Sequence, residues 1–342
     1  MADHTDIHIF ITSNGINVSR ETYVYLRVSN CLEAQAFVSR ETFKRYTMQA
    51  YICDDCPRMC HAERGLTGRG VCRMGADPVI ARAAPHYDEE PVISGTRGSG
   101  AVFFSGCSLR CRFCQNYVIS HDNYGQRIDV NRLREIYFEL IDQGVHNINL
   151  VNPTHFTRAI LESLEGGLPV PVVWNTGGYE RVETIQRLEG KVQVYLPDLK
   201  YIDPNSSRKY SAAENYFEYA SESIREMLRQ VGPVQVDNEG IIQCGVIVRH
   251  LILPGCAEES MRILDWIAEN LPGAWISLMA QYLPFGKVAG VDQLDRRLTQ
   301  EEYDMVVDHL MELGLEDGFV QELSSSDEKY IPSFDLTGVN RL

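Results

Sequence analysis

The sequence predicts an α/β protein, in which six β/α units form a partial TIM-type barrel behind an N-terminal cysteine-rich segment. Two observations predict this fold class. From residue 100 onward, apolar runs of strand length alternate with amphipathic stretches of helix length. Polar motifs follow the ends of these runs, as expected where active groups collect at the carboxyl ends of parallel strands.

Six strands are expected, at 101–105, 147–152, 170–175, 192–197, 241–253 and 275–279. Helices are expected between them, at 131–144, 182–188, 222–232 and 258–271. Regular alternation of this kind predicts a parallel sheet joined by right-handed crossovers. The last helix, at 299–315, and the strand-like run at 318–323 are expected to cover the open side of the barrel.

The chain divides into three segments. Residues 1–50 form an N-terminal extension of uncertain role, 51–99 a cysteine-rich metal-binding segment, and 100–342 the barrel with its cover. The extension holds strand-like runs at 7–11 and 22–28, and no chemistry can be assigned to it. We hypothesise that translation starts at Met48.

Composition excludes several classes of protein. The chain has 342 residues, of which 44% are hydrophobic and 23% charged, enough to bury a core. A formal charge of −15 argues against a general nucleic-acid binder that depends on phosphate contacts. No apolar run is long enough to span a membrane, and the start lacks the features of a secretory signal. We therefore expect a cytoplasmic protein, in which clustered cysteines bind metal more often than they form disulfides.

Seven of the ten cysteines lie between positions 53 and 114, and three of them form a loop of unusual spacing. Cys107, Cys111 and Cys114 are separated by three and then two residues. Structural zinc sites and most 4Fe-4S clusters take four protein ligands. Three thiolates thus leave one metal position open for a substrate or cofactor, and Phe113 would limit water there.

This loop, GCSLRCRFCQN after the apolar run AVFFSG, resembles the signature of the radical S-adenosylmethionine (SAM) superfamily. More closely, the chain resembles the pyruvate formate-lyase activating enzyme group over about residues 51–324, through INLVNPTHF, WNTGGYE, YLPDLKY, VRHLILPG and ISLMAQYLP. The resemblance implies the partial barrel of radical SAM enzymes and a 4Fe-4S cluster on the three cysteines. It also implies that SAM binds the free iron and is cleaved reductively to a 5′-deoxyadenosyl radical.

The resemblance further implies SAM-binding positions after the predicted strands. They are Asn152, Thr154, Asn175, Asp198, Lys200, Arg249 and His250, with Gln281 and Tyr282 as weaker candidates. Many relatives carry Gly-Gly-Glu after the second strand, where this chain has Asn-Pro-Thr-His. Three of the positions have structural alternatives: Thr154 as a helix N-cap, Asn175 as part of a turn with Gly177 and Gly178, and His250 as a satisfied core residue.

The upstream set comprises Cys53, Cys56, Cys60 and Cys72, and His61 could replace one of them. Four thiolates can form a closed tetrahedral site, which takes either zinc or an auxiliary iron–sulfur cluster. Unligated or redox-active thiols are the third alternative. Spacing does not choose among them, because both metals accept thiolate cages.

Two further motifs are given structural interpretations. The glycine-rich run 95–100 precedes a strand and not a helix, so the mechanism of a nucleotide-binding loop is absent and a turn is expected. Glu89 and Glu90 could form a carboxylate pair, and a solvated loop is the favoured interpretation.

The expected function is that of a radical SAM oxidoreductase that activates a partner enzyme by taking a hydrogen from one of its glycines. The expected partners are a reductant such as flavodoxin or ferredoxin and a glycyl radical enzyme as protein substrate. An alternative within the class is modification of another peptide or a metabolite. An alternative from another class is a non-catalytic iron–sulfur electron-transfer or metal-binding protein.

Overall fold

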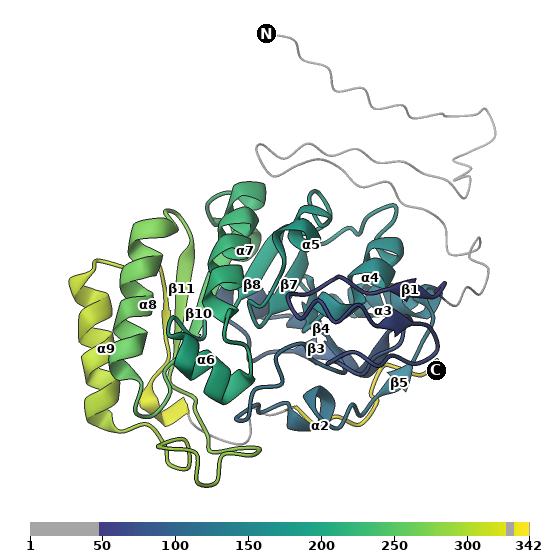
Figure 1. Cartoon of the computed structure of the whole chain (residues 1–342). Coiled ribbons are helices and arrows are strands. Elements are labelled where there is room, and N and C mark those ends of the chain that lie inside the picture. Colours follow the sequence, from purple (N-terminus) through teal and green to yellow (C-terminus); the bar gives the residue numbers. More distant parts are fainter. Residues whose placement is uncertain (1–47, 326–331, 342) are drawn as a thin grey trace, which may run out of the picture.

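The computed structural model describes residues 48–325 and 332–341, and most of its strands belong to one curved sheet (Figure 1). The order of strands across this sheet is β12-β11-β10-β8-β7-β6-β4-β3-β5, with β9 paired to β10. The strands are β3 (Val79–His86), β4 (Ser99–Phe104), β5 (Gln126–Arg127), β6 (Ile148–Val151), β7 (Val172–Thr176), β8 (Val194–Pro197), β9 (Gln235–Val236), β10 (Ile242–Leu251), β11 (Trp275–Met279) and β12 (Gly318–Val320). A separate hairpin pairs β1 (Tyr51–Ile52) with β2 (Glu63–Arg64).

Six parallel strands, β4, β6, β7, β8, β10 and β11, lie side by side in chain order. The helices are α1 (Pro91–Ser94), α2 (Tyr117–Ser120), α3 (Val130–Asp142), η1 (Thr154–Phe156), α4 (Thr157–Ser163), α5 (Val182–Gln186), α6 (Pro204–Ser211), α7 (Tyr216–Val231), α8 (Ala257–Asn270), α9 (Gln300–Glu312) and η2 (Leu323–Ser325). Each predicted strand overlaps one of the six parallel strands, so the predicted α/β partial barrel is confirmed. Within the described residues, the edge strands β5 and β12 do not pair, and the barrel stays open.

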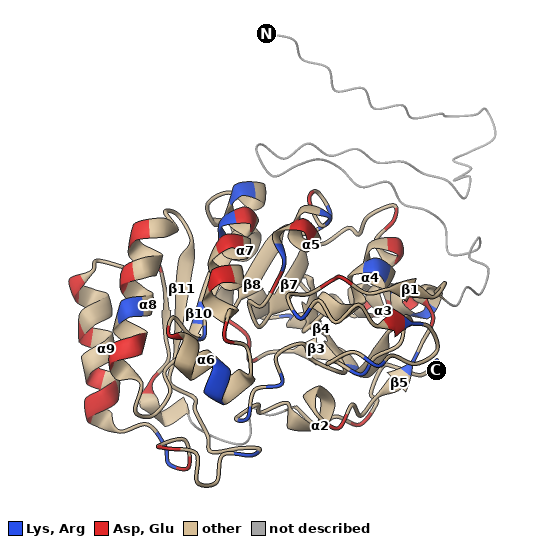
Figure 2. Ribbon diagram, viewed as in Figure 1, with Lys and Arg blue, Asp and Glu red and all other residues tan. Residues whose placement is uncertain are grey.

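The helices cover the outer face of the sheet because their apolar residues recur at helical spacing. In α3, Leu133, Ile136, Tyr137 and Leu140 are all buried. The carboxylate of Asp129 accepts a hydrogen bond from the backbone of Arg132 and begins this helix. On the outside of the molecule the helices carry charged residues instead, as Figure 2 shows along α7, α8 and α9.

Two parts of the sheet differ from expectation. The run at 318–323 was expected to cover the open side, but β12 is instead a parallel neighbour of β11, while α9 packs against α8. The edge of β11 has unpaired backbone groups, and an added strand satisfies them. In addition, β3 lies within the cysteine-rich segment yet pairs antiparallel with β4, so that segment contributes directly to the main sheet.

The strand-like runs at 7–11 and 22–28 lie outside the described residues, and the hypothesis of a start at Met48 stays a prediction. Among the helices that the structure describes, none is long and apolar enough to cross a membrane.

Candidate functional site

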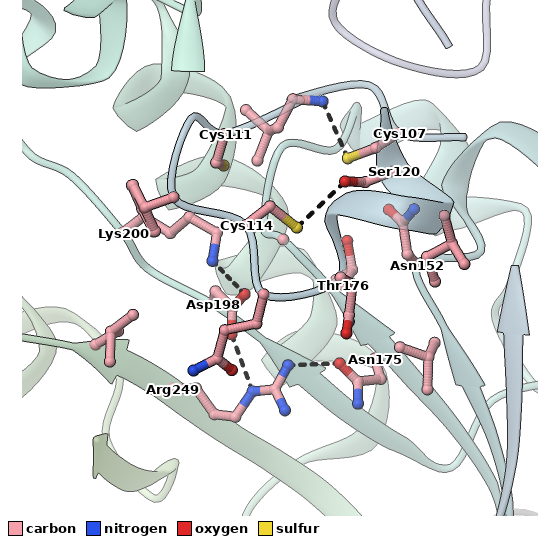
Figure 3. Close-up of a pocket in the computed structure, with 18 of the residues that line it drawn as sticks. Cys107, Cys111, Cys114, Ser120, Asn152, Asn175, Thr176, Asp198, Lys200 and Arg249 are labelled. Atoms are coloured by element: carbon pink, nitrogen blue, oxygen red, sulfur yellow. Dashed lines mark hydrogen bonds and ion pairs between the residues drawn. The ribbon is translucent and has the colours of Figure 1, made fainter. Parts of the chain in front are cut away.

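The loop that carries Cys107, Cys111 and Cys114 follows β4 directly and lines a pocket at the carboxyl ends of the parallel strands (Figure 3). The pocket has a volume of about 230 Å³. Each sulfur has a donor group beside it: the Leu109 backbone amide lies 3.4 Å from the Cys107 sulfur, the Ser211 hydroxyl 3.0 Å from that of Cys111, and the Ser120 hydroxyl 3.3 Å from that of Cys114. The loop therefore presents three buried or half-buried thiols to one space.

Other strands contribute polar side chains to the same pocket. The lining residues predicted from the sequence are Phe113, Asn152, Asn175, Asp198, Lys200, Arg249 and Gln281, and Thr176 and Gly177 join them. Phe113 packs against Tyr282, whose ring lies behind it at a centroid distance of 6.0 Å. The structure thus brings together side chains from the ends of five strands and the cysteine loop.

A network of charged side chains lines part of this pocket. Arg249 contacts Asp198 at 2.9 Å and Glu89 at 3.3 Å, and Lys200 contacts Asp198 at 2.5 Å. Burial alone would raise the pKa of Asp198, but Arg249 and Lys200 hold that pKa below its ordinary value. Asp198 is therefore ionised and shared by two cations.

Glu89 and Glu90 are not in a solvated loop, so that prediction is wrong. The Glu89 side chain is only 10% exposed and accepts hydrogen bonds from the amides of Asn149 and Asn175, each at 3.1 Å. Burial raises the pKa of Glu89 despite the opposing charge of Arg249. No local signal marks this role, because the carboxylates become buried only when the segment before α1 packs beneath the strands.

The structure does not bring His250 to the pocket, which corrects its predicted role in cofactor binding. Its imidazole bonds to the Leu199 carbonyl at 2.7 Å and the Ser260 hydroxyl at 2.9 Å, and burial lowers its pKa to about 4. Successive side chains of a strand point to opposite faces, so when Arg249 faces the pocket, His250 must face the helices. The structure supports the alternative interpretation, in which His250 is a core residue with both ring nitrogens hydrogen-bonded.

Thr154 also lies away from the pocket lining, and its hydroxyl does not cap a helix. It donates instead to the Glu180 carboxylate at 2.6 Å. The same oxygen of Glu180 accepts from Thr176 and Trp174, while its other oxygen has no partner. Burial raises the pKa of Glu180 to about 7. This buried acid, which the sequence did not single out, joins the loops that follow β6 and β7.

Glu180→Gln should change the pH dependence of stability. The folded state holds the Glu180 proton more tightly than the unfolded state, because its pKa rises from 4.5 to about 7 on folding. Stability of the wild type should therefore fall, relative to the variant, by roughly 2 to 3 kcal/mol between about pH 5 and pH 8. Urea unfolding at both pH values measures this difference. The exposed Glu183→Gln is the matched control, and an equal pH dependence for both variants would contradict the prediction.

The upstream cysteines are only partly brought together. Cys53, Cys56 and Cys72 are buried, whereas Cys60 and His61 are exposed. Burial, and then the neighbouring Cys72 and Cys53, raise the pKa of Cys56. In the part of the chain that the structure describes, no three His, Cys, Asp or Glu side chains converge on a single metal ion, and this holds for the loop of Cys107, Cys111 and Cys114 as well as for the upstream set. A cluster differs from a single ion because its thiolates bind separate irons. Zinc, a second cluster and free thiols therefore all stay predictions for this set.

The upstream segment nevertheless contacts the cysteine loop through Arg58. Its guanidinium donates to the carbonyls of Ser108 at 2.7 Å and Leu109 at 3.3 Å. At the C-terminal end of α6 it donates to the carbonyl of Ser211 at 2.9 Å and to that of the C-cap residue Ala212. One side chain from between Cys56 and Cys60 thus joins three segments of the site. Nothing in the sequence near Arg58 distinguishes it from the other arginines.

The glycine-rich run at 95–100 forms the predicted turn between α1 and β4. Gly95 and Gly98 have φ angles of 47° and 83°, in the region that favours glycine.

The donor set of the cysteine loop fits a metal cluster. Burial and the neighbouring Cys111 raise the pKa of Cys107 to about 11 and that of Cys114 to about 12. A bound metal would displace these protons, since metal binding releases ligand protons. The three thiols line one pocket and leave its opposite wall to polar side chains.

Comparisons with known proteins agree with this chemistry. Residues 94–202 match the family described as 4Fe-4S single cluster domain, a span that includes the three loop cysteines and five of the predicted pocket residues: Phe113, Asn152, Asn175, Asp198 and Lys200. Over 291 residues the chain is 30% identical to "Uncharacterized protein MJ0674" of Methanocaldococcus jannaschii, and the alignment covers 82% of this chain and 78% of that protein.

Solved structures also align with the chain. SuiB of Streptococcus suis, in complex with S-adenosylmethionine, aligns with a TM-score of 0.43 and 12% identity, over 63% of this chain and 48% of SuiB. A domain of pyruvate-formate lyase-activating enzyme from Bacteroides vulgatus aligns with a TM-score of 0.33 and 15% identity, over 56% of this chain and 91% of that domain. The chain thus spans about half the length of SuiB.

Proposed function

We propose that this chain, which belongs to the family that includes protein MJ0674, is a radical SAM enzyme that cleaves S-adenosylmethionine reductively. The observation that carries the proposal is the single pocket shared by Cys107, Cys111 and Cys114 and the polar strand ends. Its cofactors are a 4Fe-4S cluster and SAM. When bound, the reduced cluster supplies the electron that splits SAM into methionine and a 5′-deoxyadenosyl radical.

The three thiolates of the cysteine loop would hold three irons of the cluster and would leave the fourth iron free for SAM. Phe113 and Leu109 line the pocket beside the sulfurs and keep water from the reacting atoms. A water-poor site protects a carbon radical from side reactions and strengthens the interactions of the charged groups around it.

The opposite wall of the pocket would hold SAM by its polar groups. The amide oxygens of Asn152 and Asn175 and the carboxylate of Asp198 would accept hydrogen bonds from the amino group and the ribose hydroxyls of SAM. Arg249 and Lys200 keep Asp198 ionised and fix its orientation. The bonds of Arg249 to Asp198, Glu89 and Asn175 make the wall rigid before the ligand arrives.

The hydrogen atom would come from a backbone glycine of a partner enzyme. What supports this step is the resemblance of the chain to the pyruvate formate-lyase activating enzyme group, carried by the motifs after each strand. An electron donor such as flavodoxin or ferredoxin reduces the cluster. Clustered cysteines and a reducible cluster fit a reducing compartment, so we place the enzyme in the cytoplasm.

Cleavage of SAM by the full chain is the first experiment. The protein is purified and reconstituted with iron and sulfide without oxygen, then reduced with dithionite in the presence of SAM. We expect 5′-deoxyadenosine and methionine in equal amounts, measured by chromatography and mass spectrometry. Absence of cleavage, with the cluster and its reduction verified by spectroscopy, would leave a non-catalytic electron-transfer protein as the function.

A second experiment identifies the source of the hydrogen atom. A glycyl radical enzyme from the same organism is labelled with deuterated glycine and mixed with the reduced protein and SAM. Deuterium in 5′-deoxyadenosine, together with the glycyl radical signal in the partner, would support an activase. Cleavage without transfer from any such partner would favour another peptide or a metabolite as substrate.

A further inference from the structure

The C-terminal turn of α6 lies against the cysteine loop and offers a hydrogen bond to one of its sulfurs. The Ser211 hydroxyl is 3.0 Å from the Cys111 sulfur, and both residues are buried. The Arg112 amide donates to the Tyr210 carbonyl at 2.9 Å, so the backbone of the loop and that of the helix are also joined. Ser211 therefore keeps its position beside the sulfur.

A second hydroxyl decides the direction of this hydrogen bond. The Tyr201 hydroxyl lies 2.7 Å from the Ser211 oxygen and is fully buried. A thiolate only accepts hydrogen bonds, and each hydroxyl has a single hydrogen to give. When Cys111 is a metal-bound thiolate, Ser211 must donate to it, and Tyr201 must donate to Ser211.

The serine beside Cys114 donates its hydrogen to another acceptor. Ser120 lies 3.3 Å from the Cys114 sulfur but 2.8 Å from Nδ1 of His121, whose Nε2 is 3.0 Å from the Arg110 carbonyl. A carbonyl only accepts, so Nε2 carries the hydrogen and Nδ1 of the neutral ring accepts from Ser120. Ser211 is thus the side chain whose hydrogen goes to a sulfur of the loop.

Arg58 holds the turn that presents Ser211. Its guanidinium bonds to the carbonyl of Ser211 at 2.9 Å and that of Ala212, while another of its nitrogens bonds to the Ser108 carbonyl at 2.7 Å. Ala212 has a φ of 48°, a left-handed conformation that a non-glycine residue keeps only when its surroundings require it. The upstream cysteine-rich segment therefore helps to place the donor.

We propose that the hydrogen-bonded chain from Tyr201 through Ser211 to Cys111 is a positioning device that raises the reduction potential of the cluster. A reduced cluster has more negative charge on its sulfurs than an oxidised one, so a fixed donor stabilises the reduced state more. The inference rests on the proposed function, because it requires the cluster. Its consequence is that a cellular electron donor can reduce the cluster more readily.

The test is a redox titration of the reconstituted full chain, followed by electron paramagnetic resonance of the reduced cluster. Ser211→Ala should titrate at a more negative midpoint potential than the wild type, whereas Ser211→Thr, which keeps the hydroxyl, should titrate as the wild type does. Tyr201→Phe should shift the potential in the same direction by less. Ser163→Ala is the matched control, since Ser163 has a buried tyrosine partner, Tyr137, at 3.2 Å elsewhere in the fold.

An unchanged midpoint in Ser211→Ala and in Tyr201→Phe, at equal iron content, would overturn the proposal and leave the proposed function intact. If Ser211→Ala binds no cluster, Tyr201→Phe decides the outcome, because it keeps Ser211. If the wild type itself binds no cluster or cleaves no SAM, the proposed function fails first, and the two failures are thereby distinguished.

Discussion

Cys111→Ala should abolish cleavage of SAM, with a loss limited only by the detection of 5′-deoxyadenosine. Two remaining thiolates from one loop cannot hold a cluster that keeps a single open iron, since three protein ligands are needed to leave one position free. The measurement is iron and sulfide content, visible absorption and product formation after anaerobic reconstitution. All three should fall together.

Cys256→Ala is the matched control for this substitution. Cys256 is half-buried at the start of α8 and does not line the pocket, so its variant should keep both the cluster and the activity. A Cys111→Ala protein that retains cluster absorption and cleaves SAM would contradict the assignment of the loop. Equal losses in the two variants would instead indicate a general effect of removing a thiol.

Arg249→Met should destabilise the fold by about 3 to 5 kcal/mol, the usual loss when one partner of a buried ion pair is removed. Arg249 is the cation shared by Asp198 and Glu89, and the three side chains are at most 15% exposed. Without it, both carboxylates stay buried with Lys200 as the remaining cation in contact with Asp198. Urea unfolding near neutral pH measures the loss.

Two comparisons separate the charge effect from a packing effect. The double variant Arg249→Met, Glu89→Gln should recover part of the stability, because it removes one of the unpaired charges. The loss should also shrink as the pH falls, since protonated carboxyls no longer need a cation. The exposed Arg229→Met on α7 should have a much smaller effect. A loss in Arg249→Met that equals that of Arg229→Met would contradict the argument.

The pocket could be predicted in part from single strands. Asp198 and Lys200 are two residues apart just after the end of β8, and if the alternation of the strand continues they face the same way, as the contact between them confirms. The same alternation requires Arg249 and His250 to face opposite ways, but it does not say which of them faces inward. Only the packing of β10 between β8 and β11 decides that Arg249 does.

Contacts between groups that lie far apart in the chain could not be predicted from the sequence. Glu89 and Arg249 are 160 positions apart, and nothing near Glu89 predicts its burial. Ser211 and Cys111 are 100 positions apart, and Arg58 reaches the carbonyl of Ser211 across 153. A serine or arginine of this kind looks the same in the sequence as one in contact with solvent.

The sequence by itself determined the six β/α units and the loop of three cysteines, because periodicity and ligand spacing are properties of neighbouring residues. The tertiary structure decided which carboxylate shares Arg249 with Asp198 and which serine donates to Cys111. It also decided that Thr154 donates to Glu180 and does not line the pocket. These depend on the burial of polar groups, and a buried polar group must find its partner wherever the fold brings one close.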